Sequence, residues 1–237
     1  MRAFVAFFML AALCCAAGGA SQQYDGRTLY AMHCASCHGM AMEGGSQAPP
    51  LLHVDAGMVD FMLRTGRMPA MVPWEQEYRH RPQFTEPQIA ALDDYVMSHS
   101  TGERSLPDVT LPPAGYGLRK GRLVFEENCE QCHGAGGHGD GAVGYHNVAP
   151  SIMDDSPREI AEAVREGPDV MPKFGRKIID DEGLANLVAY VGYLQHAQYN
   201  PGGMQLANLG PVAEGFMAWT FGMGILVLLI RRIGETE

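Results

Sequence analysis

The sequence predicts an all-α protein built from two similar helical modules in tandem, followed by one long apolar helix. Two observations predict the modules. A five-residue motif occurs twice, as CASCH at residues 34–38 and as CEQCH at residues 129–133, and the segments around the two copies also correspond. The apolar helix is predicted by residues 212–230, whose only charged residue is Glu214 near the start. A chain of 237 residues has room for two small domains and such an appendage.

The repeated motif has the C-x-x-C-H pattern of covalent c-type haem attachment. Two thiols one helical turn apart can both bond the vinyl groups of one haem, and the adjacent imidazole is a suitable iron ligand. The sequence therefore predicts two covalently bound haem c groups, attached and ligated by Cys34, Cys37 and His38 in the first module and by Cys129, Cys132 and His133 in the second.

Two other uses of paired cysteines fit the sequence less well. The two pairs of a structural zinc site usually lie within two dozen residues of each other, whereas these begin 95 positions apart. A thioredoxin-like site would need a βαβ context, and no strand-rich run surrounds either motif. The other two cysteines, Cys14 and Cys15, lie in an N-terminal apolar run, so no disulfide framework is expected.

The order of the chain supports a tandem duplication. Short helices begin near Gly26 and Gly121 and lead into the two motifs. The pairs Tyr95-Val96 and Tyr190-Val191 are 95 residues apart, as the motifs are, and each lies on the apolar face of a closing helix. The expected division is residues 1–20 signal peptide or N-terminal anchor, 21–105 first module, 106–114 linker, 115–200 second module, and 201–237 connector and anchor.

Helix starts are also predicted. Thr85 with Gln88 forms a capping box before the closing helix of the first module, and Ser156 with Glu159 forms one before the second helical stretch of the second module. That stretch is expected to end at Gly167.

The sixth iron ligand decides what each site can do. Met68 and Met171 are the candidates, because each belongs to a Met-Pro dipeptide between the second and last helices of its module. A thioether ligand raises the reduction potential, and two strong ligands close the iron to oxygen or peroxide. Such centres transfer electrons, and we expect no catalytic residues. Met71 is the main alternative to Met68, followed by His53 and His80.

Two prolines are candidates for supporting the histidines. A metal-bound histidine usually donates its second ring N–H to a carbonyl group. The carbonyls of Pro49 and Pro150, in the loops after the two motifs, can accept these bonds, although both prolines can also serve only to shape the loops.

Residues 212–230 would form about 28 Å of helix, close to the bilayer core of about 30 Å. Arg231 and Arg232 follow directly, which by the positive-inside rule places the C-terminus in the cytoplasm and the modules outside. A buried core helix is the alternative. The net charge of −10 argues against nucleic-acid binding and favours either a basic docking partner or simple solubility.

Each module resembles class I cytochrome c in its C-x-x-C-H helix, Ala-Pro loop, Met-Pro loop and closing helix, over residues 24–197. Residues 209–219, LGPVAEGFMAW, resemble the start of the C-terminal anchor of the dihaem cytochrome c subunit of actinobacterial-type cytochrome bc complexes. That family often keeps its N-terminal hydrophobic segment, whereas residues 1–20 look cleavable.

The resemblance implies a quinol–cytochrome c reductase in which this subunit takes electrons from a Rieske iron–sulfur protein, beside cytochrome b, and passes them to a terminal oxidase. Alternatives are the cytochrome subunit of a terminal oxidase or of a periplasmic dehydrogenase. A dihaem peroxidase or haem sensor is less consistent with two Met-Pro loops, because it needs an open iron position.

Overall fold

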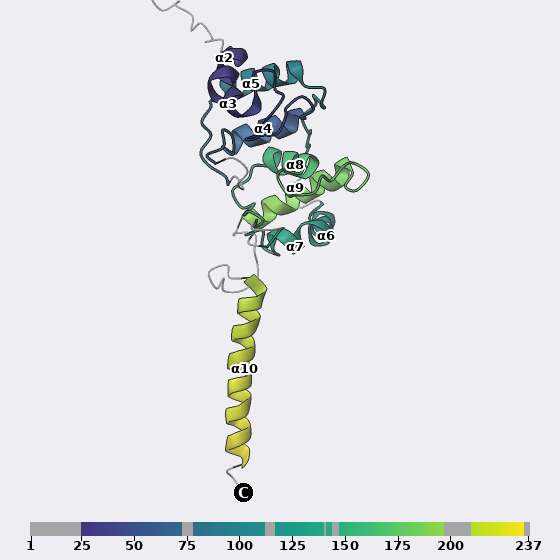
Figure 1. Ribbon diagram of the computed structural model, residues 1–237. Coiled ribbons are helices and arrows are strands. Elements are labelled where there is room, and N and C mark those ends of the chain that lie inside the picture. Colours follow the sequence, from purple (N-terminus) through teal and green to yellow (C-terminus); the bar gives the residue numbers. More distant parts are fainter. Residues whose placement is uncertain are drawn as a thin grey trace, which may run out of the picture.

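The computed structural model describes residues 25–72, 78–111, 117–139, 141–143, 147–196 and 210–234, so the predicted leader at residues 1–20 lies outside the described residues. Over these ranges the only strand pairing is a single bridge between Ala142 and Val148, and the prediction of an all-α fold is confirmed. The helices are α2 (Gly26–His33), α3 (Ala35–His38), α4 (Ala56–Arg64), α5 (Glu86–His99), α6 (Leu118–Asn128), α7 (Glu130–His133), α8 (Pro157–Glu166), α9 (Asp181–Gln195) and α10 (Gly210–Gly234) (Figure 1).

One helix crossing occurs in the same form in both modules. A Cβ atom added at Gly26 of α2 would lie 2.0 Å from the carbonyl oxygen of Ala91 in α5. A Cβ atom added at Gly121 of α6 would lie 2.0 Å from the carbonyl oxygen of Asn186 in α9. Glycine therefore lets the first and last helices of each module approach backbone to backbone.

Aromatic rings pack beside both crossings. The ring centroids of Tyr30 and Tyr95 are 5.5 Å apart, and those of Phe125 and Tyr190 are 5.6 Å apart. Tyr30 and Phe125 are almost completely buried. The repeat in the sequence therefore corresponds to a repeat in the structure, because the first and last helices pack in the same way in both modules.

The predicted helix starts are observed. Thr85 and Gln88 form a capping box at α5, and Ser156 and Glu159 form one at α8. Helix α8 is followed by Gly167 in the left-handed region, with φ of 59°. Each cap satisfies backbone N–H groups that a helix start otherwise leaves unpaired.

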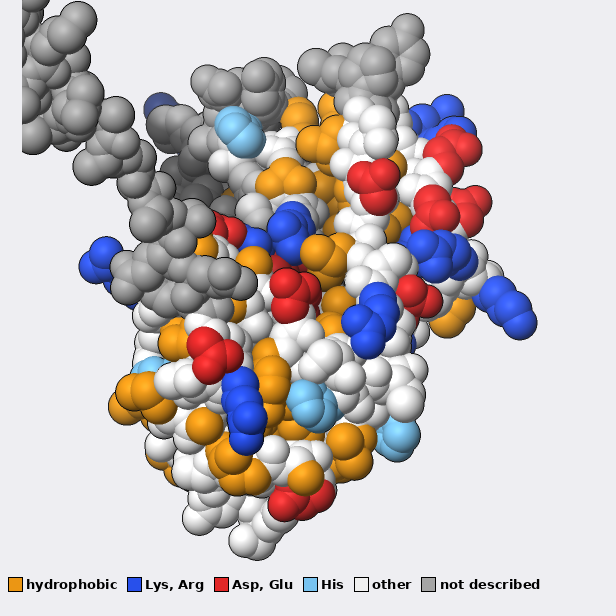
Figure 2. Space-filling model, turned by 90° about the horizontal axis from the view of Figure 1, so that it is seen from above, with side chains coloured by type: hydrophobic (Ala, Val, Ile, Leu, Met, Phe, Trp, Pro, Cys, Tyr) orange, Lys and Arg blue, Asp and Glu red, His pale blue; other side chains and the backbone are white. Residues whose placement is uncertain are grey.

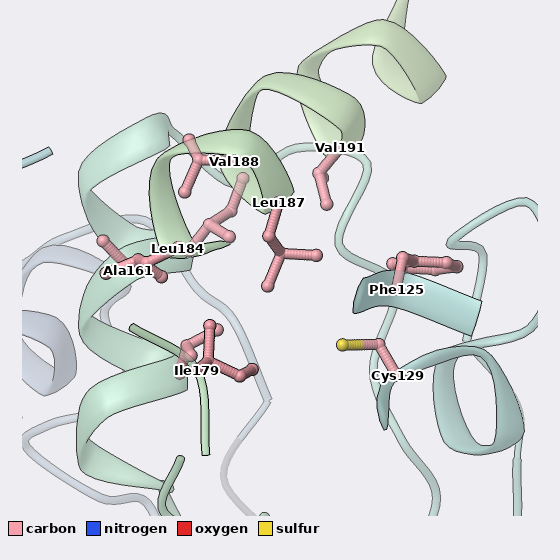
Figure 3. Packing of buried hydrophobic residues seen from close by; sticks show 10 residues of the cluster. Phe125, Cys129, Ala161, Ile179, Leu184, Leu187, Val188 and Val191 are labelled. Carbon is pink, nitrogen blue, oxygen red and sulfur yellow. The ribbon is translucent and has the colours of Figure 1, made fainter. Parts of the chain in front are cut away.

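Each module has its own hydrophobic core. In the first, Tyr30, Leu63, Ile89, Leu92 and Val96 are buried together. The second core contains the face of α9 that the sequence predicts, and in Figure 3 the sulfur of Cys129 points toward these side chains: Leu184, Leu187, Val188 and Val191.

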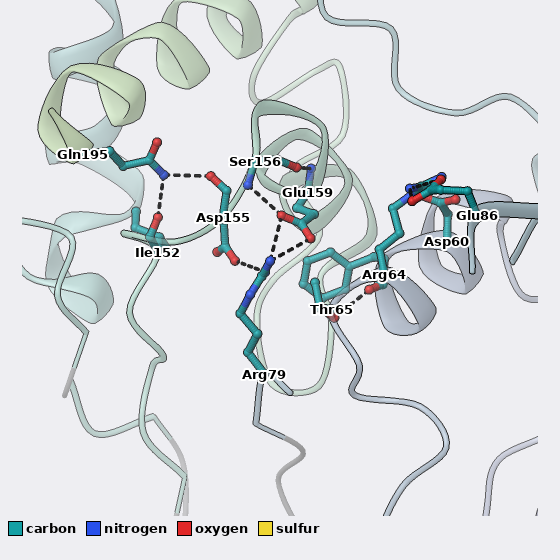
Figure 4. A network of polar contacts seen from close by, with 11 residues as sticks. Asp60, Arg64, Thr65, Arg79, Glu86, Ile152, Asp155, Ser156, Glu159 and Gln195 are labelled. Carbon is teal, nitrogen blue, oxygen red and sulfur yellow. Dashed lines mark hydrogen bonds and ion pairs between the residues drawn. The ribbon is translucent and has the colours of Figure 1, made fainter. Parts of the chain in front are cut away.

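The modules pack against each other through α4 and α8, which lie side by side in Figure 1. Arg79 of the first module forms ion pairs with Asp155 at 2.7 Å and with Glu159 at 3.0 Å (Figure 4). Both carboxylate side chains are less than a tenth exposed. The interface is therefore held in part by buried charged groups.

A second group of charges lies where α8 faces α4. Arg158 pairs with Glu162 of its own helix at 2.8 Å and with Asp60 of α4 at 2.9 Å. Asp60 also accepts from Arg64 at 2.6 Å, and Glu162 is completely buried. One carboxylate, Asp60, is thus shared by two guanidinium groups, while within the described residues Glu162 has an ion pair with Arg158 only.

Helix α10 projects away from the two modules (Figure 1). Residues Gly215–Gly234 are long and apolar enough to cross a membrane, and none of this stretch is buried within the protein. Its large apolar side chains, such as Phe216, Trp219 and Leu228, are exposed. These features fit a membrane anchor and argue against the alternative of a buried core helix.

Candidate haem sites

The first motif forms the one-turn helix α3, with Cys34 immediately before it. Cys34 and Cys37 are not joined in a disulfide, and both line a cavity. His38 is 9% exposed, and its Nδ1 donates to the carbonyl oxygen of Pro49 at 2.8 Å. Because this bond occupies Nδ1, the other ring nitrogen, Nε2, is the one available to a metal.

The second motif repeats this arrangement in α7. His133 Nδ1 donates to the carbonyl oxygen of Pro150 at 2.9 Å. Cys129 is buried, Cys132 is half-buried, and neither is in a disulfide. The structure thus places both proline carbonyls where a supporting role for the histidines requires them.

Two glycines allow the proline loops to return to the histidines. Gly44 and Gly139 occupy equivalent positions, and each donates its N–H at 2.8 Å to the carbonyl of the motif histidine. Both have positive φ, and a Cβ at either one would lie 2.5 Å from the backbone of the returning loop. Only glycine fits these turns without displacement.

The two sites open into one cavity of about 1090 Å³ between the modules. All of the residues predicted to attach or ligate haem line this cavity: Cys34, Cys37, His38 and Met68 from the first module, and Cys129, Cys132, His133 and Met171 from the second. The sequence predicts two separate sites, and the structure brings them together.

The candidate sixth ligands differ clearly in position. Met68 and Met171 are half-buried, and each packs against the hydrophobic core of its own module. Met71 also lines the cavity but is 78% exposed. His53 donates to or accepts from Thr101 Oγ1 at 2.7 Å, and neither His53 nor His80 lines the cavity. The geometry favours Met68 over its three alternatives.

The donor set suits a covalently attached haem. Burial raises the pKa of Cys34 to about 11 and that of Cys129 to about 12, and the neighbouring cysteine adds to each rise. These thiols are therefore neutral at pH 7, unlike the low-pKa thiolates of redox-active or reactive cysteines. Among the described residues, no group of three or more His, Cys, Asp or Glu side chains is arranged to hold a metal ion, as a structural zinc site would require.

The sequence does not predict that two charged residues line the cavity. Arg67 is 7% exposed and Asp155 is 9% exposed, and both line the cavity. The one sequence signal is local: Arg67 directly precedes Met68, whereas Val170 precedes Met171. Charged residues in loops are mostly exposed, so burial could not be read from the pattern.

Comparison with known proteins matches both modules. Residues 24–100 match the cytochrome c family, and residues 117–191 match the family described as cytochrome C oxidase, cbb3-type, subunit III. The cytochrome bc1 complex cytochrome c subunit of Mycobacterium tuberculosis is 35% identical over 215 residues, which cover 88% of this chain and 76% of that protein. Its counterpart from Corynebacterium diphtheriae is 31% identical over 228 residues, which cover 89% and 80% of the two chains.

The chain belongs to the family of cytochrome bc1 complex cytochrome c subunits. It has two cytochrome c domains, carries covalently bound haem c in both, and relays electrons. The predictions of tandem cytochrome c domains with a C-terminal anchor helix, of the haem c cofactors and of electron relay are confirmed.

A more distant relative is the cbb3-type cytochrome c oxidase subunit FixP of Bradyrhizobium diazoefficiens. It is 27% identical over 172 residues, which cover 70% of this chain and 59% of FixP. Both the identity and the coverage are lower than for the bc1 subunits, so the alternative of a terminal-oxidase subunit is not favoured.

Proposed function

We propose that this chain is the cytochrome c subunit of a quinol-oxidising bc complex, beside cytochrome b, and that it passes electrons from a Rieske iron–sulfur protein to a terminal oxidase. The observation that carries the proposal is the similarity to bc1 subunits over 88% of the chain. The shared cavity supports it, because a relay with two centres works best when they lie close together.

Within this proposal, the cysteine thiols of each motif attach one haem, and the motif histidine binds the iron. Pro49 and Pro150 hold the rings of His38 and His133 in orientation through the Nδ1–H bonds. Met68 and Met171, which line the same cavity, would supply the sixth ligands. Each of the two expected domains, residues 21–105 and 115–200, contains one pair of cysteines, one histidine ligand and one methionine ligand.

When bound, each haem supplies a one-electron iron couple. The residues of this chain hold the couple at a high potential through the thioether ligands and exclude external ligands from the iron. The cavity wall is largely apolar, with side chains such as Val59, Leu63, Ile160 and Leu187, so the centres would lie in surroundings of low polarity. The arrangement favours electron transfer over peroxidase or sensor chemistry.

We place the modules on the extracytoplasmic side of the membrane. Arg231 and Arg232 lie in the last turn of α10, beyond its apolar stretch, and positive residues are retained on the cytoplasmic side. Covalent haem attachment to the modules agrees with this placement. On the face seen in Figure 2, basic, acidic and hydrophobic side chains are interspersed, so docking through that face would rely on mixed contacts and not on one patch of charge.

The test is to extract the membrane protein in mild detergent, isolate it through a C-terminal tag and identify the haems that accompany it. Haem b together with a Rieske centre supports the proposed complex, and haem a or a haem–copper signature as well supports direct transfer to the oxidase. Recovery of haem c alone would overturn the assignment to a bc complex. Recovery of a haem–copper oxidase without a cytochrome b subunit and a Rieske centre would favour the alternative of an oxidase subunit.

A matched pair of double variants tests the assignment of the haem-attachment cysteines in the same preparation. Cys34→Ser with Cys37→Ser should leave one covalent haem, bound at the second motif, and Cys129→Ser with Cys132→Ser should leave the other. Retention of two covalent haems in either variant would contradict the assignment. Cys14→Ser with Cys15→Ser is the control and should keep both.

A further inference from the structure

Arg67 is a buried cation whose charge the fold leaves incompletely paired. Its side chain follows the end of α4, and the residue is 7% exposed. The guanidinium carbon lies 4.8 Å from the centre of the Phe61 ring, a cation–π distance. Its Nη1 atom has no hydrogen-bond partner within the part of the chain that the structure describes. A buried charged donor without an acceptor is costly, so this atom calls for an explanation.

The nearby acids are already engaged by another arginine. Asp155 and Glu159 lie close enough to Arg67 to attract its charge, but both form their ion pairs with Arg79, whose own charge repels Arg67. Glu159 also accepts from the backbone N–H of Ser156. Among the described residues, the acceptors at this edge of the cavity therefore do not account for Nη1.

Arg67 lines the cavity next to Met68, so a group inside the cavity can supply the missing acceptor. A haem carries two propionate carboxylates, and the planar guanidinium fork matches a carboxylate with two parallel N–H bonds. We propose that Arg67 donates to a propionate of the haem in the first module and thereby raises the reduction potential of that haem. This inference rests on the proposed attachment of that haem at Cys34 and Cys37.

The direction of the effect follows from charge. The oxidised iron centre carries one more positive charge than the reduced centre, so a nearby guanidinium in a cavity of low dielectric disfavours the oxidised state. The second module lacks the feature, since Val170 takes the corresponding place before Met171 and is 47% exposed. Arg67 would therefore make two otherwise repeated haem sites unequal.

The experiment is a potentiometric titration of the purified full chain in detergent, with the two haem components resolved. Met68→His and Met171→His identify the components, because each lowers the potential of its own haem. Arg67→Gln should lower the component that Met68→His lowers and leave the other unchanged, and Arg67→Lys, which keeps the charge but not the fork, should give a smaller shift.

Arg165→Gln is the matched control. The side chain of Arg165 is only 9% exposed, but its N–H groups bond to the carbonyls of Phe174 and Ile179 and it pairs with Asp181, and it does not line the cavity. Its loss should reduce stability and leave both potentials unchanged.

Unchanged potentials in Arg67→Gln, or a shift of the component assigned to Met171, would overturn the inference. Covalent haem content is measured in every sample. If the wild-type protein carries no covalent haem at the first motif, the proposed attachment is refuted instead. Failure of the attachment and failure of the Arg67 inference are therefore distinguishable.

Discussion

Replacing Glu162 with glutamine should change how the stability of the two-module unit depends on pH. Burial raises the pKa of Glu162 from its ordinary value of 4.5 to about 8, Asp60 adds to the rise, and Arg158 opposes it. Between these pH values the folded protein holds a proton that the unfolded chain releases. The free energy of unfolding should therefore fall as the pH rises from about 5 to about 8, and level off above about 9.

The pKa values set the size of the effect. A carboxyl pKa raised from 4.5 to about 8 corresponds to at most about 5 kcal/mol of stability lost at high pH. Since Asp60 shares the site, we expect a loss on the order of 2–5 kcal/mol in the wild type. Glutamine has nearly the size of a neutral glutamate but cannot ionise, so Glu162→Gln should match the wild type near pH 5 and exceed it near pH 9.

Urea denaturation of the full chain in detergent, followed by circular dichroism from pH 5 to pH 9, measures this difference. Asp93, whose pKa is raised to about 6 chiefly by burial, contributes the same background to both proteins. Glu182→Gln, at a side chain that is 70% exposed, is the control and should follow the wild-type curve. Parallel curves for the wild type and Glu162→Gln across this range would refute the assignment of the proton to Glu162.

Three further predictions concern the sixth iron ligand of the second module, the interface between the modules, and the crossing of α6 with α9. Met171→Ala should open one iron, so that the reduced protein binds carbon monoxide and loses part of its methionine–iron absorption band; no carbon monoxide binding would exclude Met171 as ligand. Arg79→Ala should lower the free energy of unfolding by about 2–4 kcal/mol, because it leaves two buried carboxylates without their partner, whereas Lys120→Ala, from a pair whose side chains are 70% exposed, should cost less than about 1 kcal/mol by the same denaturation assay. Gly121→Ala should lower the melting temperature strongly by forcing α6 from α9, while Gly192→Ala, with no atom within 4 Å of the added Cβ, should not; equal melting temperatures would contradict the close crossing.

The sequence predicts the repeated features well because their chemistry is local. The spacing of the haem motifs, the capping boxes and the supporting prolines each depend on a few neighbouring residues, and the structure places them as expected. The sequence shows that Gly26 and Gly121 occupy equivalent positions in the repeat, but it does not show why glycine is needed there. The cause is the carbonyl oxygen of a helix far along the chain, which no local pattern reveals.

The interface between the modules could not be predicted for a physical reason. Glu159, Glu162 and Glu166 follow one another at helical spacing on α8, a pattern typical of a solvated face. All three are less than a tenth exposed. Arg79 of the first module pairs with Glu159, while Arg158 and Lys173 of the second module pair with Glu162 and Glu166. Compensation of a buried charge depends on partners such as Arg79, some 80 residues away, which only the fold brings near.

The single cavity also constrains the order in which the protein is made. Both pairs of cysteines line the same partly open cavity, and residues of α4 and α8, which pack against each other, form part of its wall. Covalent attachment needs each motif to be reached by a free haem and by the apparatus that forms the thioether bonds. Before α4 packs against α8, each motif belongs to a separate module and the shared cavity does not yet exist. We therefore expect covalent attachment of the two haems to be less hindered before the modules dock than after.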